Sequence, residues 1–552
     1  GGGGGGFSGG GGGGDKDAGG GGGSYKDGLT NSDWASGMNS WDGSVYITRT
    51  PKYVYLTSGK CPDYYLMKTH NQAICGEAAT ALGLSDTSAG SQATNGKPDG
   101  CRYKSTSTTN LKVNTDTTEN TDCSTDDACL CVVTSNYVRG SGHGASISAG
   151  RYFSMVILHN HTIKAWGENS KGELGYGDTT ERGYGANEMG NRLPIVNLGS
   201  NARVVEVSAG GVYYGSSYQG VHACARMEDG TVKCWGENDR GQLGKGDTND
   251  EDDPSGLSAI NLGTGRTALQ VAAGGRHSCA LLDDATVKCW GRNDNGEAGI
   301  GSTSSSISTP GNVMILGTGR SAVEVCAGGF HTCVRLDNNE VKCSGWNGRG
   351  SLGTGGTSSQ STPVLIDFGN SLKAKAISCG GYHTCAILEN DELKCWGYNN
   401  AGQLGLGDTN HRGDDANEMG TNLDDVDLGN NLVAVKVSAG DLHTCAILND
   451  GSVKCWGKGS NGRLGHGATT HLGNQNGQMG DSLGEVDLGT GRTAVEIAAG
   501  YDHTCARLDD GSVKCWGEGD KGALGSESTS DIGNGSGEMG DDLLPVDLGV
   551  WV

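Results

Sequence analysis

The sequence predicts an all-β protein, a seven-bladed β-propeller preceded by a small disulfide-rich module and a glycine-rich tract. One phrase recurs seven times at intervals of 52 to 64 residues, glycine accounts for 101 of the 552 residues, and twenty cysteines occur, most of them at fixed places in the repeat. Repeats of this length are supersecondary units that need neighbours to bury their faces. A ring of seven such units is a common closed solution.

Composition narrows the classes of function. Asp and Glu outnumber Lys and Arg by 64 to 41, which gives a net charge of −23 and disfavours binding to nucleic acid. No apolar run is long enough for a membrane-spanning helix. Cysteines without any CxxC pair indicate disulfides in an oxidising compartment rather than metal sites. We therefore expect an extracellular chain with no cofactor and no metal, and we interpret its start at glycine as that of a mature fragment.

The limits of the repeat divide the chain into three segments: a glycine-rich tract (1–24), a cysteine-rich module (25–140) and the propeller (145–552). The module contains six cysteines whose connectivity the sequence does not resolve: Cys61, Cys75, Cys101, Cys123, Cys129 and Cys131. The bare amides of a glycine tract need a partner, so we expect Gly1–Gly14 to contact a neighbouring subunit. The alternative is that these glycines mark positions of unknown identity.

Each repeat predicts its strands in a fixed order. A β-branched strand ends at a glycine, and strands of the type HTCAIL and VKCWG follow, separated by a tight turn, before the segment GQLG. Each repeat is long enough for four short strands. The closing glycines are Gly150, Gly210, Gly274, Gly328, Gly380, Gly440 and Gly500. The loop 449–451 favours a type I turn followed by a left-handed glycine. That register places Cys445 directly opposite Cys455.

The same ten-residue offset recurs in six repeats, and directly opposed residues of an antiparallel pair lie close enough for a disulfide. The first repeat has Met155 and Ala165 in the two positions, so both cysteines are missing together. The predicted pairs are Cys224–Cys234, Cys279–Cys289, Cys333–Cys343, Cys385–Cys395, Cys445–Cys455 and Cys505–Cys515. Cys326 and Cys379 remain in adjacent blades. A bond between the blades is one interpretation, and the other is that their one-residue offset points them to opposite faces.

The recurring phrases HTCAIL, VKCWG and GQLG resemble the repeats of the regulator-of-chromosome-condensation family over residues 145–552. The resemblance implies a seven-bladed β-propeller. The founding member is a nuclear exchange factor for a small GTPase, an activity we expect to be absent because charge and compartment oppose it; secreted relatives use the disc as a binding or inhibitory surface. The N-terminal cysteine order is similar to a module in secreted proteins of microalgae and other protists, which implies an extracellular structural or recognition role.

Several candidate chemical groups are better explained as scaffold. A histidine precedes the first cysteine in six blades, and because each lies in a different blade a hydrogen-bonded scaffold role is favoured over a ring of metal ligands: His222, His277, His331, His383, His443 and His503. Repeat-core tryptophans are expected at Trp235, Trp290, Trp396, Trp456 and Trp516. Blade four instead has Ser344, with Trp346 two residues later. The apparent dinucleotide motif at Gly348, Gly350 and Gly353 is a copy of the repeat turn. We predict no catalytic residues and no enzyme.

Departures from the repeat supply candidate interaction residues. An insertion in blade two carries Tyr213, Tyr214 and Tyr218, which either anchor a protein or glycan or fold back on their own blade. The acidic stretch 247–253 is favoured as a solvated loop over a calcium site. The sequons at Asn160 and Asn534 predict glycosylation.

Together these features predict a non-enzymatic extracellular structural protein, a subunit of a cell-surface filament or of a flagellar hair of the mastigoneme kind. The propeller would be a rigid interaction disc, and the partners would be identical or related subunits, with glycans or cell-surface proteins as further candidates. The alternative is a secreted recognition or inhibitor propeller that binds a glycan or a protein.

Overall fold

The computed structural model describes residues 147–549 except 215 and 216, together with the backbone of nine short strands that precede residue 147; the side chains of 213–219 are not among the described groups. The chain forms two compact units, Gly1–Arg139 and Gly140–Val552. Each unit is described by itself.

The N-terminal unit contains a five-stranded sheet of order β5-β9-β7-β8-β6. The strands are β5 (Tyr53–Leu56), β6 (Ala89–Gln92), β7 (Gly100–Tyr103), β8 (Leu111–Asn114) and β9 (Ala128–Val132), with separate pairs formed by β1 (Phe7–Ser8) with β2 (Ser24–Tyr25) and by β3 (Met38–Trp41) with β4 (Ser44–Ile47). The disulfides of this module and the expected intersubunit contact of Gly1–Gly14 lie outside the described residues.

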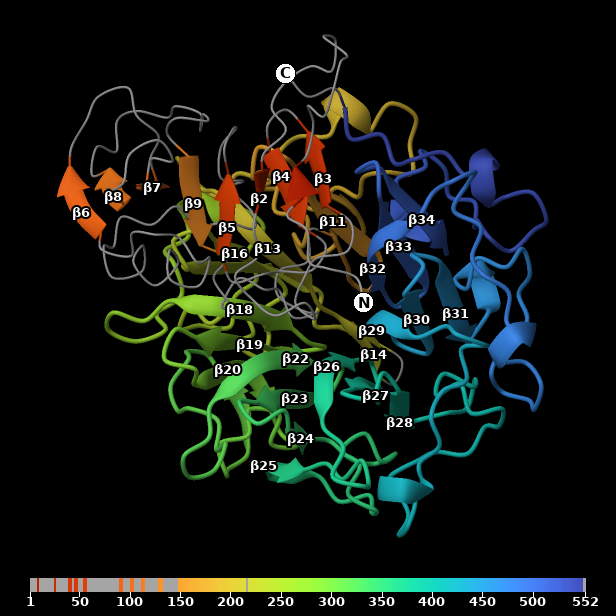
Figure 1. Cartoon of the computed structure of the whole chain (residues 1–552). Coiled ribbons are helices and arrows are strands. Elements are labelled where there is room, and N and C mark those ends of the chain that lie inside the picture. The colour runs from red at the N-terminus through yellow and green to blue at the C-terminus, as the bar shows by residue number, and fades with distance from the viewer. Residues whose placement is uncertain are drawn as a thin grey trace, which may run out of the picture. The chain divides into compact units, whose positions relative to one another are not determined.

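The second unit is a ring of seven small antiparallel sheets, here blades 1 to 7 in chain order (Figure 1). Blades 1 and 2 contain β10 (Ile147–Ala149), β11 (Phe153–Ile157) and β12 (Ile163–Gly167), then β13 (Val204–Ala209), β16 (His222–Met227) and β17 (Val232–Gly236). Blades 3 and 4 contain β18 (Ala268–Ala273), β19 (His277–Leu282), β20 (Val287–Asn293) and β21 (Ser304–Ile307), then β22 (Ala322–Ala327), β23 (His331–Leu336), β24 (Val341–Gly345) and β25 (Gln360–Leu365). Blades 5 to 7 contain β26 (Ala374–Cys379), β27 (His383–Leu388) and β28 (Leu393–Gly397), β29 (Ala434–Ala439), β30 (His443–Leu448) and β31 (Val453–Gly457), and β32 (Ala494–Ala499), β33 (His503–Leu508) and β34 (Val513–Gly517). The predicted seven-bladed propeller is confirmed.

The fourth strand expected in every blade forms only in blades 3 and 4 of the described chain. In the other blades the outer segment touches the third strand through a single bridge, such as that between Gly397 and Arg412. The long outer segments of blades 1, 5, 6 and 7 instead turn away and bond to a neighbouring blade. The amide of Gly420, for example, donates to the carbonyl of Asp367 in blade 4 over 3.0 Å. The short Ser/Thr-rich segments of blades 3 and 4 stay extended along the sheet.

A ring of backbone hydrogen bonds joins the blades at the centre. The first strands line a central cavity of about 300 Å³, and each ends at a glycine because the next blade approaches so closely. A Cβ atom on Gly274 would lie 2.5 Å from the carbonyl oxygen of Gly328. Hydrogen bonds across this contact run from the amide of Gly211 to Gly274, Gly275 to Gly328, Gly329 to Gly380, Gly381 to Gly440, Asp441 to Gly500 and Tyr501 to Gly150, at 3.0–3.2 Å.

The C-terminal segment of the described chain completes the closure between blades 7 and 1. The amide of Gly190 donates to the carbonyl of Asp547 over 2.9 Å, and the Lys164 ammonium group donates to the carbonyl of Leu548 over 2.8 Å. Each blade is built from one contiguous stretch of chain, so the ring closes by these contacts between its first and last blades.

Candidate functional site

All six ten-residue cysteine pairs are joined by disulfides, with Cα atoms 4.1 Å apart. These twelve cysteines are at most 2% exposed. In blade 1, Met155 stands opposite Ala165 at the same place of the ladder. The disulfides therefore belong to the buried core of the blades.

Cys326 and Cys379 form a further disulfide, which joins blades 4 and 5. At the equivalent place between blades 5 and 6, the amide of Ala439 donates to the hydroxyl of Ser378 over 3.0 Å. Cys326 occupies the position of that serine and Cys379 the position of that alanine, so the one-residue offset is the ordinary register between neighbouring blades. The interpretation that the offset points the two sulfurs to opposite faces is wrong.

Each of the six repeat histidines contacts the next blade, so these contacts cross six of the seven blade interfaces. The Nε2 atom of each lies 2.8–2.9 Å from a Ser or Thr hydroxyl of the next blade: Ser278, Thr332, Thr384, Thr444, Thr504 and Ser154. The Thr384 hydroxyl donates its own proton to the carbonyl of Ser351 over 3.0 Å, and the indole of Trp396 donates to the same carbonyl over 3.0 Å. Because the hydroxyl is already a donor, His331 must donate from Nε2.

The histidine–hydroxyl pairs have the spacing of a catalytic base and its nucleophile, but they are buried between the blades. His331 and Thr384 are both 0% exposed, so no substrate reaches them. Burial lowers the pKa of His331 to about 4 and the pKa of His383 to about 3, which keeps both imidazoles neutral. The histidines are distributed around the ring, in the arrangement expected for scaffold residues.

The interface between blades 1 and 2 replaces this polar contact with an apolar one. Phe153 stands where the other blades have histidine, and Ala223 stands where the next blade would have a hydroxyl. Both side chains are fully buried in one cluster with Met155 and Ala165. Loss of the donor and loss of its acceptor therefore occur together.

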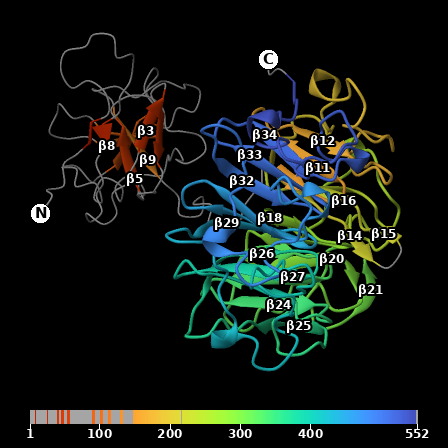
Figure 2. The same cartoon turned by 90° about the vertical axis from the view of Figure 1, so that its right-hand side faces the viewer.

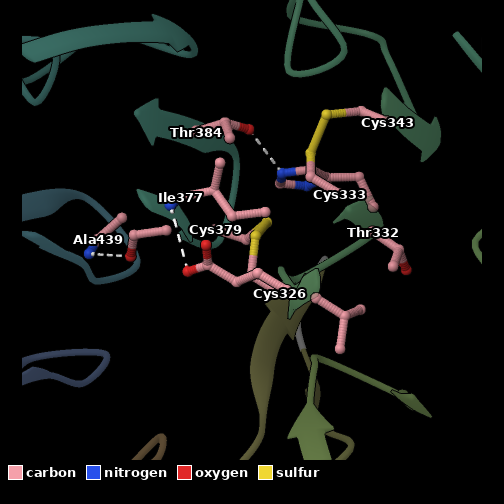
Figure 3. Close-up of a disulfide and its surroundings, with 12 residues drawn as sticks. Cys326, Thr332, Cys333, Cys343, Ile377, Cys379, Thr384 and Ala439 are labelled. Carbon is pink, nitrogen blue, oxygen red and sulfur yellow. Dashed lines mark hydrogen bonds between the residues drawn. A yellow bond between two sulfur atoms is a disulfide. The ribbon is translucent and has the colours of Figure 1, made fainter. Parts of the chain in front are cut away.

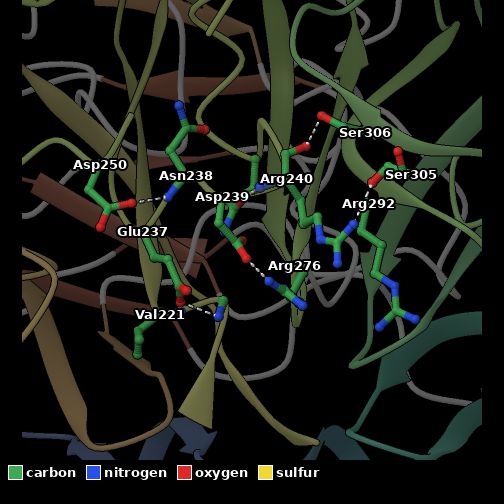
Figure 4. A network of polar contacts seen from close by, with 12 residues as sticks. Val221, Glu237, Asn238, Asp239, Arg240, Asp250, Arg276, Arg292, Ser305 and Ser306 are labelled. Atoms are coloured by element: carbon green, nitrogen blue, oxygen red, sulfur yellow. Dashed lines mark hydrogen bonds and ion pairs between the residues drawn. The ribbon is translucent and has the colours of Figure 1, made fainter. Parts of the chain in front are cut away.

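Four of the five carboxylates of the acidic stretch in blade 2 form local contacts: Asp247, Asp250, Glu251 and Asp253. Lys245 lies between Asp247 and Glu251, with its ammonium nitrogen 3.5 and 3.3 Å from their oxygens. Asp250 accepts from the amide of Asn238 over 2.8 Å (Figure 4). Among residues 147–549 as described, the only side chains with converging ligand atoms are cysteines already joined in disulfides. The favoured interpretation of this stretch as a loop rather than a calcium site is consistent with these contacts.

The insertion in blade 2 forms a hairpin of β14 (Val212–Tyr214) and β15 (Ser217–Gln219), which projects from one side of the propeller (Figure 2). The buried Val212 side chain lies against the glycines at the centre of the propeller. A Cβ atom on Gly275 or Gly329 would lie within 3.0 Å of it. Val212 thus packs at the end of the central cavity. The side chains of Tyr213, Tyr214 and Tyr218 are outside the described part of the structure, and their contact role stays a prediction.

Blades 4 and 5 carry a cluster of aromatic residues that the repeat does not predict. We call Phe330, Trp346, Tyr382 and Tyr398 the aromatic sector. Trp346 lies 5.7 Å from Tyr382, whose ring is 5.9 Å from that of Tyr398. The three rings of Trp346, Tyr382 and Tyr398 are partly exposed, whereas Phe330 is buried beneath them. This arrangement presents an amphipathic surface of the kind enriched at protein interfaces.

Two arginines flank the aromatic sector. The Arg292 guanidinium lies 5.1 Å from the ring centre of Phe330, and the Arg349 guanidinium lies 5.9 Å from that of Tyr398. Both distances are within the range of cation–π contacts. Arg292 is also paired with Asp294 over 2.9 Å, so Arg349 is the exposed cation beside the aromatic sector.

A polar pocket of about 500 Å³ adjoins the aromatic sector in blade 5. Its His411 ring lies 5.0 Å from that of Tyr398, and burial lowers the pKa of His411. Hydrogen-bonding groups of both kinds line the pocket: Asn400, Thr409, Asn410, His411, Arg412, Asp414, Asp415 and Glu418. A pocket of this size can hold a small polar group of a partner.

The sequence of blade 4 indicates the aromatic sector through its exchanged serine and tryptophan. All six other blades have Trp at the position of Ser344, including Trp166 of blade 1, and each of those Trp side chains is fully buried. In blade 4 the buried Ser344 hydroxyl has no hydrogen-bond partner, and the tryptophan is displaced by two residues to the surface. Two residues along a strand keep the same side of the sheet but move towards its end.

The predicted glycosylation sites lie in different settings. Asn160 is exposed at the turn between β11 and β12, and its side-chain oxygen accepts a bond of 2.6 Å from the Thr162 hydroxyl. Asn534 is half-buried, and its amide donates to Glu538 over 3.0 Å. Use of either sequon stays a prediction.

A family model described as the RCC1-like domain matches residues 183–535. The chain is 28% identical to the ultraviolet-B receptor UVR8 of Arabidopsis thaliana over 386 residues, which cover 69% of this chain and 78% of the receptor. It is 27% identical to the human E3 ubiquitin-protein ligase HERC2 over 375 residues, 67% of this chain but only 7% of the ligase.

Solved structures share the fold at low sequence identity. Prp20p of Saccharomyces cerevisiae matches with a TM-score of 0.55 and 21% identity, over 73% of this chain and 88% of its own. Human WBSCR16 matches with a TM-score of 0.52 and 20% identity, over 69% and 92%. The described residues contain no helix of the length and apolarity that a bilayer span requires. The repeat, the ring of seven blades and the family match lead to one conclusion: this chain belongs to the RCC1-like domain family.

Proposed function

We propose that the chain is a non-enzymatic extracellular structural protein, a cystine-stapled interaction disc that forms part of a cell-surface filament or flagellar hair. One observation carries the extracellular part of the proposal. Every described cysteine is in a disulfide, and disulfides in such number persist in oxidising compartments. A rigid disc that is cross-linked by disulfides suits a structural subunit of a filament.

Protein binding is the activity that the family favours. Prp20 of yeast has been solved bound to Kap60, and its binding to Gsp1p and histones is described in its title. The ligase activity named for HERC2 is not transferred, because this chain spans 7% of that protein. We assign the contact surface of this chain to the aromatic sector, since partly exposed Trp and Tyr beside Arg are the residue types that dominate interface energetics.

Charge favours a second copy of the chain as the partner. The outer segments of blades 5 and 7 expose paired aspartates, Asp424 with Asp425 and Asp541 with Asp542. Arg292 is already paired with Asp294 over 2.9 Å, whereas the exposed Arg349 beside the aromatic sector is complementary in charge to these segments. We propose that the sector of one copy receives an acidic outer segment of the next. A contact between different patches of identical copies builds an open filament when its rotation does not close into a ring.

The polar pocket beside Tyr398 favours a second candidate function. A secreted recognition propeller would place a glycan or a peptide group in this pocket and stack it on the aromatic sector. In that case the same surface would serve a soluble partner and the disc would remain a dispersed monomer.

Negative-stain electron microscopy and sedimentation velocity of the full-length oxidised chain, at low and high salt, distinguish the two functions. We expect filaments at low salt that dissociate at high salt, because salt screens the charge contact. A monomer under all conditions would contradict the filament proposal and favour the recognition function. A nucleotide-release assay on a small GTPase should show no stimulation.

A further inference from the structure

Two disulfides of the propeller touch each other. The Sγ atoms of Cys326, Cys333 and Cys379 all lie within 4.8 Å of one another (Figure 3). Cys326 of β22 stands directly opposite Cys333 of β23, which stands opposite Cys343 of β24. Three sulfurs therefore form a row across blade 4, and the fourth, Cys379, reaches the row from blade 5.

The two disulfides differ in access. Cys326 and Cys379 are half-buried and line the central cavity. Cys333 and Cys343 are 0% exposed. A small molecule that enters the cavity thus meets the Cys326–Cys379 bond and cannot reach the Cys333–Cys343 bond directly. Glu206 and Glu324 also line the cavity, and each is paired with an arginine, Arg226 and Arg335 respectively.

We propose that Cys326–Cys379 is a modification site for small thiols and that Cys333–Cys343 is its internal exchange partner. The thiolate of a small thiol attacks Sγ of Cys379 and forms a mixed disulfide. The Cys326–Cys379 bond breaks, and Cys326 leaves as a thiolate. No oxidant is consumed, because one disulfide replaces another.

The released Cys326 thiolate then attacks Sγ of Cys333. The Cys326–Cys333 bond forms, the Cys333–Cys343 bond breaks, and Cys343 leaves as a thiolate that takes a proton from water. Two disulfides are present before and after the sequence, one of them now shared with the added thiol. The step needs little motion, since directly opposed residues of an antiparallel pair have Cα atoms roughly 4.5–5.5 Å apart.

No other described blade offers this row. The residue opposite the first paired cysteine is Ser208 in blade 2, Ser378 in blade 5 and Ser438 in blade 6. Blades 3 and 7 have Ala272 and Ala498 there. Exchange is therefore confined to blade 4. Its first step opens the covalent link between blades 4 and 5, the two blades that carry the aromatic sector.

The test treats the native full-length chain with 2-mercaptoethanol, stops the reaction with acid at timed intervals, alkylates free thiols and maps disulfides by mass spectrometry. We expect the Cys326–Cys379 bond to disappear at least tenfold faster than Cys445–Cys455. A Cys326–Cys333 peptide and alkylated Cys343 should then appear. Loss of the seven described propeller disulfides at one rate, or loss of Cys326–Cys379 without a Cys326–Cys333 product, would overturn the proposal.

Matched variants test whether exchange depends on the row of sulfurs in blade 4 or on a general lability of the disulfides. Cys379→Ser releases the Cys326 thiol without added reagent and should accumulate the Cys326–Cys333 bond. The double variant Cys326→Ser with Cys379→Ala restores the residues of the other blades and should make Cys333–Cys343 as inert as Cys445–Cys455. Ser438→Cys adds a third sulfur to the row of blade 6 and should transfer exchange there; an unchanged Cys445–Cys455 bond in that variant would contradict the geometric argument.

Discussion

Blades 1 and 4 both depart from the repeat, and they do so in opposite ways. In blade 1 every change is matched: Met155 with Ala165 replaces a disulfide, and Phe153 with Ala223 replaces a histidine–hydroxyl contact, all within one buried cluster. In blade 4 the change is unmatched, because Ser344 keeps a buried hydroxyl without a partner. The displaced Trp346 instead joins a partly exposed aromatic sector.

The difference separates repacking from function. A departure that is compensated inside the core leaves no buried polar group without a partner and does not alter the surface of the disc. In blade 4 a buried tryptophan is lost from the core and a tryptophan is present at the surface instead. Such a change indicates that this surface binds a partner. The following predictions test this distinction, beginning with the largest expected effect.

Reduction of the disulfides should lower the stability of every blade except blade 1. Each ten-residue loop contributes on the order of 2–3 kcal/mol through the unfolded chain. Full reduction should therefore lower the midpoint of thermal unfolding by roughly 15–30 °C, measured by circular dichroism. The double variant Cys385→Met with Cys395→Ala, which copies blade 1, should show only one loop's share. A midpoint that does not move on reduction would contradict the account.

Acid should destabilise the ring through its neutral histidines. Their folded-state pKa is lowered, to about 4 for His222 and about 3 for His503, so below pH 6.5 the unfolded chain binds more protons and the free energy of unfolding falls. Linkage gives about 2 kcal/mol for each histidine at pH 5. Four carboxyl groups act in the opposite direction between about pH 8 and pH 5, because their pKa is raised to 7 or 8: Glu173, Glu324, Asp441 and Glu518.

Since six histidines outnumber these four carboxyls, we expect maximum stability near neutral pH and a decline below pH 6, measured by urea unfolding. Replacing one histidine–hydroxyl pair with the apolar pair of blade 1, His331→Phe with Thr384→Ala, should reduce the slope in the acid range. An equal free energy of unfolding at pH 6.5 and pH 4.5 would show that the imidazoles are not held neutral.

The tryptophans of blades 4 and 5 should differ in their contribution to stability. Trp396 is 0% exposed, and Trp396→Ala should cost about 3–5 kcal/mol because it leaves a large cavity. Trp346 is partly exposed, and Trp346→Ala should cost about 1 kcal/mol. Denaturant unfolding of the two variants gives the comparison. A cost for Trp346→Ala equal to that of Trp396→Ala would make Trp346 a core residue.

The smallest effect concerns a single blade interface. Thr384→Ala leaves the buried Nε2–H group of His331 without an acceptor and should cost about 1–3 kcal/mol. The double variant with His331→Phe should cost less, as the pair Phe153 and Ala223 already fills the equivalent place. A double variant less stable than the single one would show that blade 1 depends on its own surroundings.

Much of the fold follows from the repeat because its determinants are local. The hairpin turn and the opposed cysteines lie within eleven residues of each other, so the register of Cys445 with Cys455 could be predicted. The absence of a fourth strand from the other five described blades could not be predicted, because an outer segment can hydrogen-bond either to its own sheet or to the neighbouring blade. The contact of His331 with Thr384 depends on two blades meeting at a fixed offset.

The aromatic sector was missed for the same reason. Trp346 and Ser344 were visible as an exception in one repeat, but Tyr382 and Tyr398 belong to the next repeat and look unremarkable in isolation. Only the packing of blade 4 against blade 5 brings Trp346 within 5.7 Å of Tyr382. The tyrosines of the β14–β15 hairpin were visible in the sequence, and their role is still a prediction.

The most direct test of the central claim measures the assembly of the oxidised full-length chain by sedimentation velocity and negative-stain microscopy. Trp346→Ala would be compared with Lys458→Ala, which changes the equivalent position of blade 6. The account predicts that the wild-type chain and Lys458→Ala form filaments at low salt, whereas Trp346→Ala remains dispersed with its propeller folded. Filaments of normal length from folded Trp346→Ala would contradict the assignment of the aromatic sector as the interaction surface.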